Sequence, residues 1–292
     1  MKNLIVRTIT GVFFVAAIVV AFMRPEAMIM LFALVTGLTI WEFCGLVNDR
    51  ITGVTVNRFI STVAGVYFFL AMAGYCSGLV SSNGVFIPYL LTVIYLFISE
   101  LYLKQAIPVN NWAYTMLSQM YIALPFSVIN ILAFNGSPDG TIRFNTILPL
   151  SVFVFLWVND TGAYCVGSLL GKHKLFPRIS PGKSWEGSIG GAVFVIIAAC
   201  LINWFDQQGA DPTNAALNPS VLSLIQWIGL GLVVVVFGTW GDLVESLFKR
   251  TINIKDSGNI LPGHGGMLDR FDSSLMAFPA AVVYIYTLTI LN

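Results

Sequence analysis

The sequence predicts an all-α, polytopic integral membrane protein, and three observations support this fold class. Of the 292 residues, 57% are hydrophobic and only 10% are charged, whereas soluble domains carry about 25% charged residues. The apolar residues form runs long enough to cross a bilayer, which takes about 20 residues in a helix. The few charges gather between these runs. The net charge of +1 gives no indication of a nucleic-acid partner.

Nine apolar segments predict about nine transmembrane helices. They span residues 4–22, 27–47, 59–79, 85–103, 114–134, 145–170, 188–205, 221–241 and 274–291. The first follows Lys2 and Arg7 as in a signal peptide, but no clean small-residue cleavage site comes after it, so we expect a retained helix. The sixth is apolar only over residues 147–158. Because this stretch is too short to span, its helix is expected to carry Asn159 and Asp160 inside the bilayer.

The distribution of positive charge predicts the orientation, because cytoplasmic loops carry an excess of Lys and Arg. With the N-terminus in the cytoplasm, the outer loops hold only Arg24 and Arg143 of the 15 basic residues. The odd number of helices then places the C-terminus outside. The two longest inner loops, 171–187 and 242–273, lie late in the chain. We therefore expect a catalytic region in residues 135–292, facing the cytoplasm, and a scaffold, lipid groove or dimer region in residues 1–134.

The loop 171–187 has the composition of a phosphate-binding segment. Its cations stand among Gly, Ser and Pro: Lys172, Lys174, Arg178 and Lys183. Glycine allows close backbone approach, and cations with free N–H groups suit phosphate. Ser184 and Glu186 then lead into a helix whose N-terminus favours an anion. A basic loop that contacts anionic lipid head groups explains this loop alone equally well.

The segment after residue 241 carries the densest charge. If the helix continues, Asp242, Glu245, Ser246 and Lys249 share one face. Taken alone, this pattern is more typical of a helix end at the membrane interface with one Glu–Lys pair.

The next stretch, "NILPGHGGMLDRFDSS", favours chemistry instead. A tight glycine-rich turn precedes Asp269 and Asp272, with Arg270 between them. Ionisable groups at membrane depth are costly and usually mark function. Clustered carboxylates with few histidines suit Mg²⁺, which bridges protein oxygens and substrate phosphates. Carboxylates for metal beside cations for phosphate predict phosphoryl or nucleotidyl transfer.

Residues 246–272 resemble the signature of the phosphatidate cytidylyltransferase (CDP-diglyceride synthetase) family, bacterial type. The matching positions are Ser246, Lys249, Arg250, Lys255, Asp256, Gly258, Leu261, His264, Gly265, Gly266, Asp269, Arg270 and Asp272. The stretches "NDTGAY" and "SPGKSWEG" also look like motifs of this family. Together these segments cover about a third of the chain.

The resemblance implies transfer of a cytidylyl group from CTP to phosphatidic acid, giving CDP-diacylglycerol and pyrophosphate. It implies Mg²⁺ and a monovalent cation such as K⁺, with metal held by Asp242 and Asp269. It further implies a homodimer in the bacterial inner membrane, among membrane lipids. A phosphate monoester is mostly dianionic at neutral pH, so the nucleophile needs relief from charge repulsion more than it needs a strong base.

The candidate site residues follow from the charged segments and the resemblance together. Those expected to be catalytic are Asp242, Asp269, Lys249, Arg250, Lys255 and Arg270. Those expected to bind substrate are Lys183, Ser180, Ser184, Glu186, Asp160, Ser246, Asp256, His264, Gly265, Gly266 and Asp272. For His264, positioning a phosphate and packing in the turn carry equal weight.

Two other classes of protein share some of these features. A CTP-dependent membrane lipid kinase would transfer the γ-phosphoryl group and release CDP. An ion-coupled transporter would use Asp160, Glu42 and Glu100 as ion sites, but transporters typically contain internal repeats, and the sequence shows none.

Overall fold

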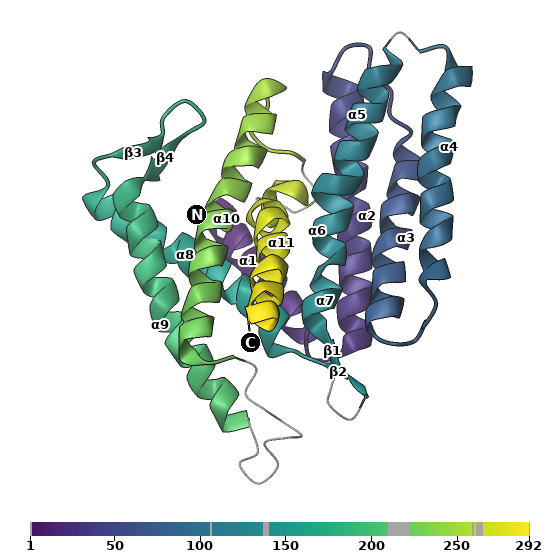
Figure 1. The fold of residues 1–292 in the computed structure, drawn as a ribbon. Helices are drawn as coiled ribbons and strands as arrows, with labels where there is room; N and C mark the ends of the chain where they lie inside the picture. Colours follow the sequence, from purple (N-terminus) through teal and green to yellow (C-terminus); the bar gives the residue numbers. More distant parts are fainter. Residues whose placement is uncertain are drawn as a thin grey trace. The chain divides into compact units, whose positions relative to one another are not determined.

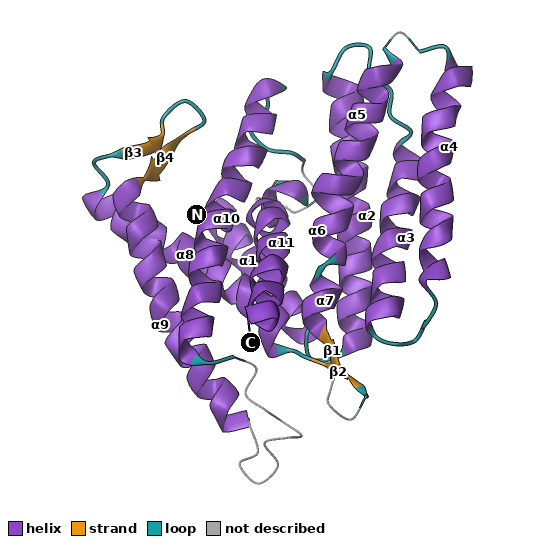
Figure 2. Cartoon of the chain, in the orientation of Figure 1, coloured by secondary structure: helices purple, strands orange, loops and turns teal. Residues whose placement is uncertain are grey.

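The chain is an all-α polytopic membrane protein, as the sequence predicts. The structure is a computed structural model that describes residues 2–105, 107–136, 140–209, 222–258, 260 and 265–291. Within these ranges, eight helices are long and apolar enough to cross a membrane, and a shorter apolar stretch, Thr8–Ala21, lies in α1 (Lys2–Ala21). This shorter stretch belongs to the first of the nine predicted segments. The described strands form two small hairpins (Figures 1 and 2).

The helices group into two compact units. One contains residues 1–134 and 249–271, and the other contains residues 135–248 and 272–292. Residues 249–271, which we expected to group with the C-terminal region, belong to the first unit instead. The scaffold and catalytic roles of the two predicted regions stay predictions.

The first unit begins with four helices and one interrupted span. Its elements are α1, α2 (Pro25–Arg50), α3 (Arg58–Cys76), the 3₁₀ turn η1 (Asn83–Phe86), α4 (Ile87–Leu103), α5 (Pro108–Ser118), the π-helical η2 (Gln119–Ala123), α6 (Leu124–Ser127) and α7 (Ile129–Ala133). Proline stands in the first turn of α2, α4 and α5, where its missing N–H leaves no intrahelical bond unmade.

An aromatic cluster forms the core of the first unit and includes Phe271. The Phe32 ring centroid lies 5.5 Å from that of Phe22 and 6.2 Å from those of Phe126 and Phe271. The rings of Phe126 and Phe271 meet edge to face at 5.3 Å. Such pairs add stability beyond the area that they bury. The start of α11 (Leu268–Leu291) is thereby packed into this unit.

The second unit holds four long helices and the hairpins. Its elements are β1 (Phe134–Gly136), β2 (Ile142–Phe144), α8 (Ile147–Leu170), β3 (Lys174–Phe176), β4 (Ser180–Ser184), α9 (Trp185–Gly209), and the parts of α10 (Leu224–Thr251) and α11 assigned to this unit. The predicted loop 242–273 is therefore too long, because α10 continues to Thr251 and α11 begins at Leu268. The predicted loop 171–187 contains an antiparallel hairpin that pairs Lys174 with Ser184.

Small residues let α8 and α9 lie against each other. A Cβ atom on Gly162 of α8 would approach the Phe194 ring to 2.9 Å and the Gly191 Cα to 3.2 Å. Small residues at helix interfaces allow such close approach in membranes. The packing places the "NDTGAY" segment of α8 beside α9.

Candidate active site

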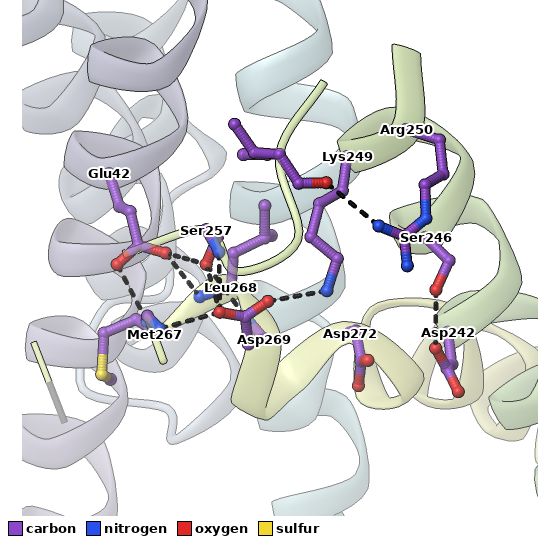
Figure 3. Close-up of polar contacts among 12 residues, drawn as sticks. Glu42, Asp242, Ser246, Lys249, Arg250, Ser257, Met267, Leu268, Asp269 and Asp272 are labelled. Atoms are coloured by element: carbon purple, nitrogen blue, oxygen red, sulfur yellow. Dashed lines mark hydrogen bonds and ion pairs between the residues drawn. The ribbon is translucent and has the colours of Figure 1, made fainter. Parts of the chain in front are cut away.

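Glu42 of α2 forms hydrogen bonds to three residues of the signature segment, which is residues 246–272. Its side chain is buried, and its carboxylate accepts hydrogen bonds from Ser257 Oγ at 2.5 Å, Met267 N at 2.9 Å and Leu268 N at 3.1 Å. The last two donors stand at the N-terminal end of α11, where unpaired N–H groups favour a negative charge. Figure 3 shows these bonds converging on Glu42. Glu42 therefore has a structural role, because its hydrogen bonds hold the signature segment to α2.

Asp269 lies at the centre of the same network. Its Oδ1 accepts from Lys249 Nζ at 2.7 Å, and its Oδ2 accepts from the backbone N–H groups of Ser257 and Gly266, each at 2.8 Å. The Ser257 hydroxyl, whose single proton is donated to Glu42, lies 3.0 Å from Oδ2 and accepts from Asp269 N at 3.3 Å. The Lys249 and Asp269 side chains are only 12% and 6% exposed. Because a buried charge that loses its partner is strongly destabilising, removing either side chain of this pair is expected to destabilise the segment.

Two glycines make room for this network. A Cβ on Gly266 would collide with the Glu42 carboxylate and the Ser257 hydroxyl. Gly265 has a φ of +82°, a conformation that glycine adopts readily and other residues rarely do. The predicted glycine-rich turn is thus required at these two positions. His264 lies outside the described residues.

Four charged residues of the signature segment are exposed at the surface of the first unit: Arg250, Lys255, Asp256 and Arg270. Arg250 donates from Nη1 to the Ile254 carbonyl at 3.3 Å. The three exposed cations are suitably placed at the surface of this unit to meet an anion.

In the second unit, three carboxylates gather where α10 and α11 approach each other. One carboxylate oxygen from each of Asp242, Glu245 and Asp272 lies within 4.8 Å of the other two. A Cβ on Gly241 would come within 2.6 Å of the Asp272 carbonyl oxygen, so glycine allows this approach. We call these three residues the carboxylate cluster. Figure 3 shows Asp242 and Asp272 side by side.

Two side-chain donors contact Asp242. Ser246 Oγ donates to Oδ1 at 3.2 Å, and Lys183 of β4 forms an ion pair with Oδ2. Lys183 and Asp242 are 25% and 30% exposed, so solvent and ligands can reach this pair. Both donors belong to rotatable side chains, which can move away when a ligand competes for the carboxylate.

A pocket of about 530 Å³ lies beside Lys183. Residues of α8, the β3–β4 hairpin, α9 and α10 line it: Asn159, Asp160, Ala163, Tyr164, Gly167, Ser168, Lys174, Gly182, Lys183, Ser184, Gly187, Ser188 and Thr239. Its volume is that of a small-molecule site. Hydroxyls, glycines and two lysines supply the groups that bind phosphate. The predicted residues Asp160, Lys183 and Ser184 all contribute to the lining.

The hairpin is held to α9 by hydrogen bonds. Trp185 N donates to the His173 carbonyl at 2.9 Å, and the Glu186 carboxylate accepts from His173 N at 3.2 Å and lies 2.5 Å from His173 Nδ1. Ser184 Oγ accepts from Gly187 N at 3.2 Å in the manner of an N-cap. Glu186 therefore positions the hairpin. The predicted site residue Ser180 lies in β4, opposite Phe176 of β3.

Comparison with known proteins shows the family. The sequence profile of the cytidylyltransferase family matches residues 5–288, which is nearly the whole chain. The chain belongs to the cytidylyltransferase family.

Relatives in the family carry a more specific name. A phosphatidate cytidylyltransferase of Staphylococcus epidermidis (strain ATCC 12228 / FDA PCI 1200) is 32% identical over 276 residues, which cover 94% of this chain and 96% of the relative. Phosphatidate cytidylyltransferases of Staphylococcus haemolyticus (strain JCSC1435) and Staphylococcus aureus (strain COL) are 46% and 45% identical over 130 residues. In those two cases the matched stretch covers 44% of this chain and 45% of the relative, less than half of either protein.

Most residues that the structure of this cytidylyltransferase family member brings together are predicted from the sequence. Which of them contact one another is not. Asp242 lies with Lys183 and Ser246 in the second unit, whereas Asp269 lies with Lys249 and Ser257 in the first. For Glu42, a charge near the inner end of an apolar helix, the sequence favours a structural role about as much as an ion site, and the structure gives it structural hydrogen bonds. Glu100, considered in the same way, accepts a hydrogen bond from Asn111 Nδ2 at 2.9 Å.

Tyr164 and Thr239 of the pocket lining were not predicted as site residues. Tyr164 is part of the "NDTGAY" motif, which was the only sequence signal for it. Thr239 lies in an apolar run of α10, and the sequence contains no signal for its place in the pocket.

Proposed function

We propose that this chain transfers a cytidylyl group from CTP to phosphatidic acid, giving CDP-diacylglycerol and pyrophosphate. Membership of the cytidylyltransferase family and the names of its staphylococcal relatives support this reaction. The observation that carries it is the carboxylate cluster joined through Lys183 to a polar pocket on membrane-spanning helices. This arrangement suits a phosphorylated nucleotide that reacts with a membrane lipid.

The proposed step forms one bond and breaks one. An oxygen of the lipid phosphate attacks the α-phosphorus of CTP, and the bond between the α-phosphorus and the oxygen bridging to the β-phosphorus breaks. Pyrophosphate leaves with that electron pair. Because a phosphate monoester is mostly dianionic at neutral pH, no proton needs to be removed from the nucleophile. The protein must therefore orient two anions and balance their charge.

The pocket residues perform this orientation in the proposal. Lys174 and Lys183 bind phosphate oxygens, and the Ser184 and Ser188 hydroxyls add neutral donors. Lys183 exchanges its pairing with Asp242 for a phosphate when the nucleotide enters. The "NDTGAY" residues of α8 form a further wall of the pocket, where Asp160 meets the nucleotide or its counter-ion.

The residues of the carboxylate cluster fit a hard divalent cation. Three carboxylates, each with an oxygen within 4.8 Å of the other two, supply the hard oxygen donors that Mg²⁺ prefers. We propose Asp242 as a ligand, with Glu245 and Asp272 beside it. When bound, Mg²⁺ neutralises phosphate charge and polarises the phosphoryl oxygens. The resemblance also implies Asp269 as a ligand and a monovalent cation such as K⁺, and both stay predictions.

The exposed cations of the first unit have a separate proposed role. Arg250, Lys255 and Arg270 bind phosphate charge and the leaving pyrophosphate. Arginine presents a planar fork of donors to phosphate, and lysine presents a compact point charge.

We also propose where the chain works. The chain is a multi-pass membrane protein, and the excess of basic residues in the predicted inner loops supports a bacterial cell membrane with the site facing the cytoplasm, where CTP is available. A homodimer is proposed on the resemblance alone.

A label-transfer assay tests the proposed reaction. The purified protein in detergent micelles is given phosphatidic acid, Mg²⁺ and CTP radiolabelled at either the α- or the γ-phosphorus. We expect the α-label in a lipid with the mass of CDP-diacylglycerol, and the γ-label in pyrophosphate. Transfer of the γ-label to lipid would identify a kinase instead, and no labelled lipid from either substrate would overturn the proposal.

A further inference from the structure

An apolar groove of about 450 Å³ runs between α10 and α11 in the second unit. Val233 and Phe237 of α10 line it together with Met276, Ala280, Val283 and Thr287 of α11. Among the described residues, none that lines the groove is charged. We propose that this groove binds one acyl chain of the lipid substrate, an inference that rests on the proposed function.

The surroundings of the groove determine the chemistry of its ligand. Both helices belong to candidate membrane spans, Leu224–Thr251 and Leu268–Ile290, so the groove opens to hydrocarbon rather than to water. Its polar lining groups are few, and Tyr284 directs its hydroxyl to the Gln226 carbonyl of α10 at 3.1 Å. The phenol ring of Tyr284 lines the groove as an apolar surface. A flexible hydrocarbon chain suits such a surface, whereas a polar ligand would find few partners.

The length of the groove matches one leaflet of a bilayer. Met276 and Thr287 are separated by eleven residues of α11, which is about 16 Å at the helical rise of 1.5 Å per residue. Half of a hydrocarbon core of about 30 Å is about 15 Å. A chain lying along the groove therefore has about the length of one leaflet, and it runs from eight residues inside the start of the Leu268–Ile290 span to three residues before its end.

The near end of the groove adjoins the carboxylate cluster. Met276 stands one helical turn beyond Asp272, and Phe237 stands five residues before Asp242. A lipid whose phosphate reacts beside the cluster thus has an apolar path for its chain along the same two helices. This continuity distinguishes the groove from an apolar surface with no link to the site, and it favours the substrate over other lipids as the occupant.

The middle of the groove is shaped by Pro279 of α11, which stands inside the helix. A proline there cannot donate the usual hydrogen bond to the carbonyl four residues earlier, and its ring pushes that carbonyl away. Proline at this position favours a bend in α11 and hence space between α10 and α11. At the far end, the Tyr284–Gln226 bond holds the two helices together.

Photolabelling tests occupancy without requiring turnover. The intact chain in phosphatidylcholine nanodiscs is irradiated with a phosphatidate that carries a diazirine in one acyl chain, and the adducts are mapped by mass spectrometry. We expect adducts on the Met276–Thr287 segment that excess phosphatidate removes and added free phosphatidylcholine does not. Equal competition by both lipids would show bulk lipid in the groove. Absence of adducts, as when a second copy of the chain covers the groove, would equally overturn the proposal.

A matched pair of variants links the groove to substrate use. Ala280→Phe fills the groove, and Val282→Phe places the same ring at a position of the same helix that is also half-buried but lies outside the lining. For dioleoyl phosphatidate we expect Ala280→Phe to raise KM by at least about tenfold, the scale on which apolar pockets discriminate. The KM for CTP and the turnover of dihexanoyl phosphatidate should stay within about twofold in both variants.

An equal rise in KM for both variants, or no rise in Ala280→Phe, would overturn the inference. Val283→Phe at the rim of the groove serves if Ala280→Phe does not accumulate in the membrane. Failure of the proposed function is distinguishable, because it would appear as no lipid product from the unmodified protein, while the photolabelling result would still report on the groove.

Discussion

Asp269 in the first unit and Asp242 in the second are both aspartates on membrane helices, yet their partners differ in kind. Asp269 accepts two hydrogen bonds from backbone N–H groups and one from a buried lysine. Among the described residues, Asp242 meets only side-chain donors, Ser246 and Lys183, and it has two other carboxylates as neighbours. Backbone donors cannot leave, whereas side chains rotate. The first arrangement stabilises a segment, and the second can accept a cation or release a lysine to a phosphate.

The largest expected effect comes from Asp242→Asn. The substitution keeps the size of the side chain but removes its charge, and loss of one preorganised electrostatic group costs about 10²-fold or more in turnover. We expect at least this loss in kcat for CDP-diacylglycerol formation, with normal membrane insertion. Asp49→Asn, at an exposed carboxylate of α2, is the control and should keep its activity. Near-normal turnover in Asp242→Asn would remove the carboxylate cluster from the chemistry.

Glu42→Gln tests the structural side of the comparison. The amide keeps one acceptor oxygen but brings an NH₂ group toward the donors of Ser257, Met267 and Leu268. A buried donor left without a partner costs about 1–3 kcal/mol, so the free energy of unfolding should fall by this amount. Thermal unfolding in detergent measures it, and Glu26→Gln on the exposed surface of the same helix is the control. An unchanged unfolding midpoint would mean that Glu42 does not hold the segment.

Lys183→Ala should act on nucleotide binding more than on turnover. Removing a charge-assisted contact to phosphate costs about 1.5–3 kcal/mol, so the KM for CTP should rise roughly tenfold or more. Steady-state kinetics with varied CTP and saturating lipid measure this effect. A fall in kcat with an unchanged KM would place Lys183 in the transition state instead.

The smallest expected effect comes from Lys255→Ala. Lys255 is exposed, and exposed charges contribute about 1 kcal/mol or less. We expect the KM for CTP to rise no more than about fivefold, with the difference from the unmodified protein shrinking at high salt because exposed charges are screened. A salt-independent loss larger than that expected for Lys183→Ala would reverse the proposed ranking of the two lysines.

The sequence predicted the fold class because hydropathy reports which segments can lie in hydrocarbon. It did not predict where the helices end. The charged residues from Asp242 to Arg250 continue α10, and a helix can extend past the apolar stretch that crosses the membrane. The predicted loop 242–273 was too long for this reason.

The site was predictable as a set of residues but not in the contacts that each residue makes. The resemblance identified Asp242 and Asp269 without showing their different partners. The bond between Glu42 and Ser257 joins residues 215 positions apart. Nothing in a single sequence indicates a pairing over that distance. The pocket residue Thr239 is likewise invisible in a run of apolar neighbours.

The most direct test of the central claim compares the unfolding of Asp242→Asn and Asp269→Asn in the same detergent. Both substitutions are expected to lower turnover, so activity cannot separate them. Asp269→Asn removes the carboxylate charge from the buried ion pair with Lys249 and should lower the free energy of unfolding by about 3 kcal/mol or more, whereas Asp242→Asn should change it by less than about 1 kcal/mol. A lowered midpoint for Asp269→Asn and an unchanged midpoint for Asp242→Asn is the predicted result. Equal midpoints for the two variants would contradict the account.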